Sequence, residues 1–247
     1  MPINLVLTLM VSGLLILLAG VVAAVYYATY AVRSQWLGQA DFMGRISEKA
    51  VALTFDDGPS PSTERILDIL AGHNLKATFF MIGRYVDRFP QTAKRVVAEG
   101  HEIGNHSYSH PIYLYRSPRE TREQLGRAQA LIATIAGVEP KFVRPPCGVR
   151  TPAYFRAARD LGLRTVLWDV AGFDWKRRSG EQIANEVLRK ARSGSIVLLH
   201  DGDSEGKQDR EQTVAALPLI IEGLSARGLR IVPLAGLLEE KELDLAA

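Results

Sequence analysis

Short apolar runs alternate with amphipathic stretches from about Lys49 onward, and no other feature of the sequence limits its fold as strongly. The apolar runs are closely followed by polar, Gly or Pro residues, as buried parallel strands usually are. The stretches between them carry apolar residues at helical spacing. Neither a low-complexity segment nor an internal repeat interrupts the alternation. This pattern predicts an α/β fold in one domain.

The predicted elements follow from the same pattern. Strands are expected at residues 50–55, 77–82, 102–104, 141–143, 165–168, 196–199 and 230–232, and helices at 63–73, 91–99, 118–136, 152–161, 182–192 and 212–226. Ser117 begins a capping box with proline at the first helical position, and Thr151 is likewise followed by proline. Periodicity leaves both a compact parallel barrel and a doubly wound sheet open. In either layout the chemistry lies at the carboxyl ends of the strands.

The N-terminal segment differs from the rest of the chain. Its first 32 residues contain no Asp, Glu, Lys, Arg or His, and residues 5–24 are apolar over a length that crosses about 30 Å of hydrocarbon as a helix. A cleaved signal peptide is the competing interpretation, but it would carry a basic segment before the apolar run. We therefore expect a transmembrane anchor at 1–32, a linker at 33–48, a catalytic domain at 49–240 and a tail at 241–247.

The charge distribution around this anchor and the substrate implied below predict opposite orientations for it. Tyr26, Tyr27, Tyr30 and Trp36 follow the apolar run as an interfacial aromatic belt would. Lys and Arg occur only after the run, beginning at Arg33, which by the positive-inside tendency favours a cytoplasmic domain. The substrate implied below favours the opposite side.

Charge and cysteine content exclude few classes of protein. The 247 residues carry a formal net charge of +3, and Lys and Arg are dispersed among Asp and Glu, so no nucleic-acid partner is expected. Cys147 is the single cysteine, which rules out a disulfide within the chain.

Two motifs suggest a metal site. Asp56 and Asp57 directly precede Gly58 and Pro59 at the end of the first predicted strand, where two like charges repel unless a cation or a base role separates their protonation states. His106 and His110 follow another strand at a spacing that can converge on one metal. Two imidazoles and a carboxylate are typical of a catalytic rather than a structural zinc-type site.

Three further segments end predicted strands. The segment from Arg144 to Gly148 is a loop stiffened by two prolines, and the guanidinium of Arg144 is always charged. Asp174 and Trp175 follow the fifth strand, and Leu198 and His200 end the sixth, where a histidine is placed for acid–base work.

Other candidates carry less weight. His73 and His101 are isolated and are expected to be ordinary surface or helix-end residues. The loop from Asp201 resembles the start of a calcium loop, but its twelfth position is Gln212 instead of glutamate and no helix precedes it. The absence of a G-x-S-x-G elbow leaves a serine hydrolase unsupported.

Taken in order, these five segments resemble the five motifs of the polysaccharide deacetylase family of carbohydrate esterases, also called the NodB homology domain. The resemblance spans about residues 50–238 and implies a distorted, incomplete (β/α) barrel. It also implies that three residues bind one divalent metal ion, most simply zinc, with cobalt, nickel or manganese as alternatives. These ligands would be Asp57, His106 and His110.

The resemblance further implies the role of each remaining site residue. Asp56 would be the general base held by Arg144, and His200 the general acid tuned by Asp174. The backbone N–H of Cys147 would help to bind the oxyanion, and Trp175 and Leu198 would wall an acetyl pocket. The family usually has an aromatic residue where Cys147 stands. The main-chain role survives this change, whereas a sugar-contacting ring is lost.

The expected function is therefore metal-dependent removal of N-acetyl groups from an amino-sugar polymer such as peptidoglycan or chitin, by a single-pass membrane protein whose domain faces the cell wall. An O-acetyl esterase of the xylan type, a cyclic-amide hydrolase and an inactive glycan-binding homologue remain as alternatives.

Overall fold

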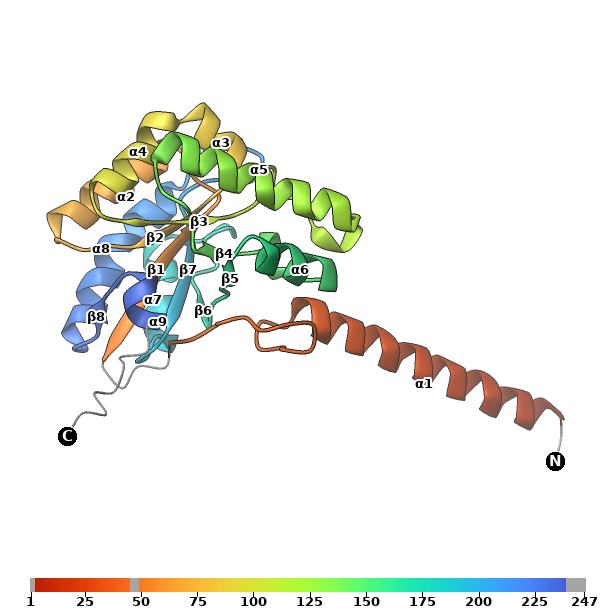
Figure 1. Cartoon of the computed structure of the whole chain (residues 1–247). Coiled ribbons are helices and arrows are strands. Elements are labelled where there is room, and N and C mark those ends of the chain that lie inside the picture. Colours follow the sequence, from red (N-terminus) through yellow and green to blue (C-terminus); the bar gives the residue numbers. More distant parts are fainter. Residues whose placement is uncertain (1–2, 45–48, 239–247) are drawn as a thin grey trace, which may run out of the picture.

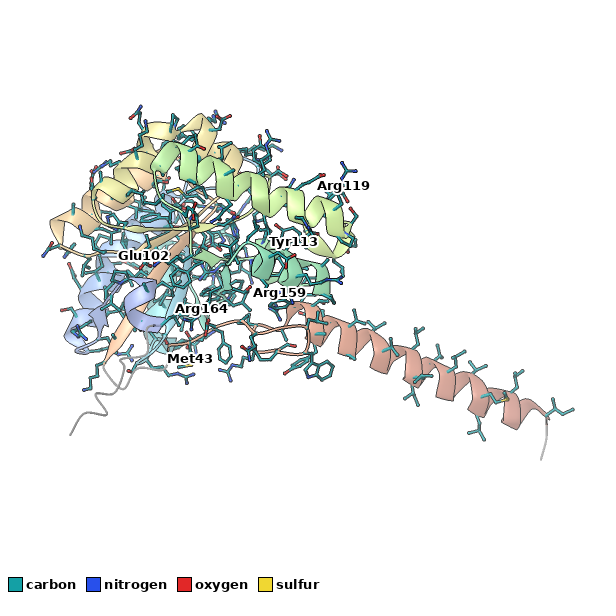
Figure 2. The ribbon with its side chains drawn as sticks, in the orientation of Figure 1. Met43, Glu102, Tyr113, Arg119, Arg159 and Arg164 are labelled. Carbon is teal, nitrogen blue, oxygen red and sulfur yellow. The ribbon has the colours of Figure 1, made fainter. Side chains whose placement is uncertain are left out.

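The computed structural model describes residues 3–44 and 49–238 and shows a domain from which one long helix projects (Figure 1). This helix, α1 (Ile3–Tyr30), has one stretch that is long and apolar enough to cross a membrane, Leu7–Tyr30, with a mean hydropathy of 2.5. An N-terminal signal sequence meets the same criteria of length and composition. The apolar side chains of α1 point outward along most of its length (Figure 2).

The domain is built on a curled sheet in which every strand pair is parallel. Along the sheet the order is β5-β4-β3-β2-β1-β7-β6, and β8 pairs with the first residues of β1. The strands are β1 (Ala50–Asp56), β2 (Thr78–Met81), β3 (Glu102–Asn105), β4 (Phe142–Val143), β5 (Arg164–Thr165), β6 (Val170–Ala171), β7 (Ile196–His200) and β8 (Arg230–Ile231). The end strands β5 and β6 form no ladder with each other within residues 49–238, so the barrel stays incomplete, as predicted.

Helices follow most of the strands. They are α2 (Pro61–Gly72), α3 (Gly83–Arg88), α4 (Pro90–Ala98), α5 (Pro118–Ala136), α6 (Pro152–Asp160), α7 (Gly180–Lys190), α8 (Glu211–Ala226) and α9 (Leu234–Leu238). The predicted capping box at Ser117 is confirmed, and the Thr151 side chain accepts the Tyr154 N–H. Two capping boxes that the sequence analysis missed begin α2 at Ser60 and α7 at Ser179.

The central strand β1 is buried on both faces. Val51, Leu53 and Phe55 belong to the main core beneath the outer helices, whereas Ala50 and Ala52 pack against α9 inside the curl. Strands covered on both sides read as continuous apolar runs, which is why 50–55 was recognisable in the sequence. Because α9 fills the end of the curl where the strands begin, the opposite end is left for polar side chains.

The fifth strand differs from its prediction. Residues 165–168 were expected to be one strand, but the structure has β5 at Arg164–Thr165 and a separate β6 at Val170–Ala171. Between them, the Leu167 N–H donates to the carbonyl of Asp41 and the Asp169 carboxylate accepts the Ile196 N–H. Pairing with a segment distant in the sequence therefore bends the chain here. Periodicity along one strand cannot reveal such pairing.

Residues 31–44, which we call the arm, pack along the domain. Asp41 forms a parallel bridge with Val166, and Met43 forms an antiparallel bridge with Ser195. The Asp41 carboxylate also binds Arg164 through both oxygens. Met43 and Arg164 mark this contact in Figure 2. The arm covers most of the predicted linker, of which residues 45–48 lie outside the described part of the chain, as does the predicted tail at 241–247.

Candidate active site

The site lies at the carboxyl ends of the parallel strands. Asp56 ends β1 and His200 ends β7, and the Cα atoms of these two residues are partners in the strand register. Leu198 lies two residues before His200 and therefore faces the same side of β7. The register thus places the predicted base and the predicted acid side by side.

Asp57, His106 and His110 form a cluster that can hold a metal ion. One ligand atom from each residue lies within 4.8 Å of the other two. The Asp57 Oδ1 atom is 3.4 Å from His106 Nε2 and 3.3 Å from His110 Nε2. All three side chains are buried or nearly so. The three predicted metal ligands therefore converge.

The protonation states suit a cation. Burial alone would raise the pKa of Asp57, but the surrounding rings of His200, His110 and His106 hold it well below its usual range. Burial lowers the pKa of His110 to about 4, which leaves its ring neutral. His106 Nδ1 lies 2.8 Å from the Arg144 carbonyl, which can only accept, so this nitrogen carries a proton. Burial alone would lower the pKa of the His106 ring, but the charges of Asp56 and Asp57 raise it, and a cation bound beside these carboxylates would take the place of the proton on Nε2.

One atom of the cluster lacks a partner. Asp57 Oδ1 is buried and accepts no hydrogen bond from the described residues. A buried carboxylate oxygen without a donor is costly unless a cation compensates it. Two neutral imidazoles and one carboxylate are a donor set that zinc and its first-row neighbours accept. The residues present therefore fit a divalent metal.

A fully buried arginine holds Asp56. Arg144 Nη1 donates to Asp56 Oδ1 at 2.7 Å and to the Thr54 hydroxyl at 2.8 Å, and Nη2 donates to the Leu167 carbonyl. The guanidinium carbon also lies 4.1 Å from the ring centroid of Phe80. With so many fixed contacts, Arg144 orients one oxygen of Asp56 and leaves Oδ2 facing His106.

Asp174 holds His200 through both of its oxygens. Oδ1 lies 2.8 Å from His200 Nδ1, and Oδ2 accepts the His200 backbone N–H and the Thr213 hydroxyl. Burial alone would lower the pKa of the His200 ring, but the charge and hydrogen bond of Asp174 outweigh it and raise the pKa to about 9. The ring is therefore a protonated donor at neutral pH.

The three remaining predicted residues are Trp175, Leu198 and Cys147. The Trp175 ring contacts the His200 ring edge-on at 5.3 Å between centroids, and Trp175 is exposed, whereas Leu198 is buried. A cavity of about 340 Å³ lined by Asp174, Trp175 and Thr213, among others, lies beside them. Cys147 is exposed and lies in the short 3₁₀ turn Pro146–Gly148, whose other two residues are buried.

Backbone strain gathers in the motifs. The described non-glycine residues with positive φ are Asp57, Asn74, Ser107, His110, Cys147 and Phe173. All but Asn74 lie within a motif or next to one. Such conformations persist only where surrounding contacts over-determine them, as at functional sites.

Sequence reasoning missed three supporting residues. Thr54 and Thr213 hold Arg144 and Asp174, and Asp201 accepts the Gly58 N–H and the Thr63 hydroxyl beneath the Asp57 turn. Asp201 follows His200 directly, which is a signal that could have been used. Thr213 lies inside a helical pattern, and nothing in the sequence marks it.

Comparison with known proteins agrees with this geometry. A profile of the family described as "Polysaccharide deacetylase" matches residues 44–166. A peptidoglycan-N-acetylglucosamine deacetylase of Bacillus cereus is 43% identical over 200 residues, covering 79% of this chain and 91% of the relative. The chain belongs to the polysaccharide deacetylase family.

Other relatives share the family and the fold. A chitooligosaccharide deacetylase of Bradyrhizobium sp. is 40% identical over 195 residues, covering 75% of this chain and 89% of the relative. The crystal structure of a peptidoglycan N-acetylglucosamine deacetylase with a bound N-oxidanyl-benzamide matches with a TM-score of 0.77 and 38% identity, covering 81% of this chain and 92% of that one. These relatives support deacetylation of a polysaccharide, and they confirm the predicted family and fold class.

Proposed function

We propose that this family member is a metal-dependent hydrolase that removes N-acetyl groups from peptidoglycan, with its domain on the cell-wall side of the membrane. One observation carries the proposal. The Asp57, His106 and His110 cluster lies beside Asp56, which Arg144 holds, and Asp56 is the register partner of His200, which Asp174 holds. A metal site, a base and an acid are the groups that amide hydrolysis needs.

The cluster would hold one divalent ion, and zinc suits its donor set best. When bound, such an ion acidifies water and stabilises negative charge on a carbonyl oxygen. Asp57 would supply the charge, and the two histidines would supply neutral nitrogen ligands.

Asp56 is proposed as the general base. Arg144 fixes one of its oxygens, so the carboxylate is oriented to take a proton from the attacking water. The other oxygen, Oδ2, lies 3.8 Å from His106 Nε2 and so faces the metal cluster. Arg144 acts on the reaction only through this carboxylate.

His200 is proposed as the general acid. An amine is a poor leaving group unless it is protonated, and a ring whose pKa is about 9 carries the proton to be given. Asp174 stabilises that charged ring and fixes its orientation. The Cys147 N–H would donate to the oxyanion, an interaction worth on the order of 3 kcal/mol in comparable sites. Trp175 and Leu198 would hold the acetyl methyl group.

Peptidoglycan is favoured over chitin on two grounds. The relative with the highest identity given above is a peptidoglycan deacetylase, and an apolar N-terminal helix would keep the enzyme beside the wall polymer. A chitooligosaccharide substrate is the alternative that the Bradyrhizobium relative suggests.

Acetate release tests the proposal directly. The full-length protein in detergent is incubated with peptidoglycan, chitooligosaccharide and acetylated xylan, with and without chelator. We expect release from peptidoglycan that chelator abolishes and added zinc restores. Release from xylan alone would identify an ester hydrolase, and no release from any glycan in the presence of metal would identify a binding homologue.

Asp56→Asn separates the base from the metal site. This variant keeps all three proposed ligands, so we expect normal metal content. Turnover should fall by roughly 10²- to 10⁴-fold, the usual contribution of a general base. Near-normal turnover would contradict the base assignment.

A further inference from the structure

Arg150 joins the end of α1 to the loop that carries Cys147. Its side chain is fully buried, although a guanidinium keeps its charge in proteins. Nη2 donates to the Ala31 carbonyl at 2.6 Å, and Nη1 donates to the Gly148 carbonyl at 3.0 Å. The Arg150 backbone N–H donates to the Thr29 carbonyl. One residue therefore binds the helix end and the loop together.

The end of α1 compensates this buried charge. The last carbonyls of a helix have no intrahelical donor and carry the negative end of the helix dipole. No carboxylate of the described residues forms an ion pair with Arg150. Since a buried charge without partners is expensive, the guanidinium needs the Ala31 carbonyl, directly after α1, as well as the Gly148 carbonyl.

The loop has a conformation that needs support. Cys147 has φ 55° and Gly148 has φ 70°, so two successive residues occupy the left-handed region. A Cβ atom on Gly148 would lie 3.0 Å from the Trp168 ring. The Arg150 bond to the Gly148 carbonyl fixes the peptide between Gly148 and Val149, directly after these two residues.

We propose that the last turn of α1 is a working part of the catalytic domain: by binding Arg150, it holds the loop of Cys147 and Gly148 in the conformation that points the Cys147 N–H into the site. Arg150 is then a positioning residue, and the membrane helix is more than a tether. This inference rests on the proposed function, because the oxyanion role of Cys147 belongs to it.

Beyond Ala31, which Arg150 binds, the arm attaches to the domain separately. Its contacts through Asp41, Met43 and Gly44 reach the sheet and not the Cys147 loop. Loss of the Arg150 side-chain contact therefore leaves these later contacts in place, and variants at Arg150 report on the junction between α1 and the arm.

The first test replaces Arg150 in the full-length protein. Arg150→Met should lower kcat roughly ten- to hundredfold with little change in KM, because misplacing a catalytic group by about 1 Å costs this much while substrate contacts remain. Arg150→Lys should recover part of kcat, since an ammonium still donates to carbonyls. Arg156→Met is the matched control, because Arg156 is exposed in α6 and has no ion pair among the described residues.

Cys147 supplies a readout that does not depend on activity. It is the single cysteine, so the rate of thiol alkylation reports on its loop alone. We expect a severalfold change in this rate in Arg150→Met, with metal content unchanged, and no change in Arg156→Met. Reduced kcat with an unaltered alkylation rate would overturn the proposal.

The second test perturbs the helix and leaves Arg150 intact. The double variant Ala28→Gly, Thr29→Gly loosens the last turn, because each glycine disfavours helix. The control pair Ala19→Gly, Ala23→Gly lies within the span and away from the domain. The first pair should reproduce the kcat and alkylation effects of Arg150→Met, and the control pair should not.

Failure of this inference is distinguishable from failure of the proposed function. If the wild-type protein releases no acetate, the proposed function fails, and the alkylation rates still decide whether the helix end orders the loop. If acetate is released and both Arg150→Met and the first glycine pair behave as wild type, only the present inference is wrong.

Discussion

Three carboxylates of the site have different neighbours, and these neighbours decide what each can do. Asp56 forms an ion pair with Arg144. Asp57 faces the imidazole rings of His106 and His110, and Asp174 binds both His200 and Thr213. The same functional group therefore serves as proposed base, metal ligand and tuning partner. Environment, and not residue type, makes the distinction.

The Asp174 and His200 pair gives a pH prediction. In the folded protein the His200 pKa is about 9, above its ordinary value of 6.5, so the charged ring stabilises the fold below about 6.5 and this contribution is lost as the pH rises through 9. Asp174→Asn removes the charge but keeps the burial, so the His200 pKa should fall. The alkaline limb of the kcat–pH profile should move to lower pH.

The control for this prediction is Asp209→Asn, since Asp209 is exposed and lines the same cavity of about 340 Å³ as Asp174. Its profile should match the wild type. An unmoved alkaline limb in Asp174→Asn would mean that His200 is not the acid whose titration limits the rate.

Metal binding should be visible in thermal stability. A ligand present at a hundredfold excess over its Kd stabilises the folded state by about 2.7 kcal/mol. Zinc should therefore raise the Tm of the wild-type protein and of Asp56→Asn, whereas Asp57→Ala should show no rise. A zinc-dependent rise in Asp57→Ala would place the metal elsewhere.

At the scale of elements, the turn between β1 and α2 depends on contact with β7. A Cβ on Gly58 would lie 2.1 Å from Asp201 Oδ2, while the Asp201 carboxylate accepts the Gly58 N–H. The Ser60 hydroxyl donates to the Asp201 carbonyl. The turn that presents Asp57 is thus shaped by the residue that follows His200, which couples the proposed metal ligand to the strand of the proposed acid.

Gly58→Ala tests this close approach. The methyl group has no room, so the variant should lose roughly 1–3 kcal/mol of stability, and its Tm should fall by several degrees. Gly72→Ala is the matched control, since nothing lies within 4 Å of its Cβ position at the end of α2. Its Tm should be unchanged or slightly higher. Equal Tm values for the two variants would contradict the predicted crowding.

At the scale of the whole molecule, the arm connects the apolar helix α1 to the curled sheet. Asp41 and Met43 of the arm reach β-structure on both sides of the open part of the sheet, beside β5 and before β7. The apolar helix therefore does not end in a free tether, because the arm that follows it is bound to the sheet.

The side of the membrane remains a prediction with two competing arguments. The distribution of Lys and Arg favours a cytoplasmic domain, whereas a wall polymer requires the opposite. Protease added to intact cells should degrade the domain if it faces the wall, and a cytoplasmic protein should survive in the same cells. A protected domain that becomes sensitive after lysis would support the charge distribution and would remove peptidoglycan as the substrate.

The sequence alone established the α/β class and the positions of most elements, and it predicted candidate site residues that the structure brings together. Buried parallel strands are continuous apolar runs, caps have local signatures, and the groups that do the chemistry follow strands whose ends must meet. Features of this kind involve consecutive residues, so the capping box at Ser117 could be predicted directly. The convergence of Asp57 with His106 and His110 was predicted from the resemblance of the motifs to the family.

How those residues are held became apparent only in the folded molecule. The split of β5 from β6, the contacts of Thr213 and Asp201, the pairing of the arm and the bond from Arg150 to Ala31 all join segments far apart in the chain. Buried polar groups need hydrogen-bond partners. This requirement means that a partner must exist, but it does not specify where along the chain the partner lies.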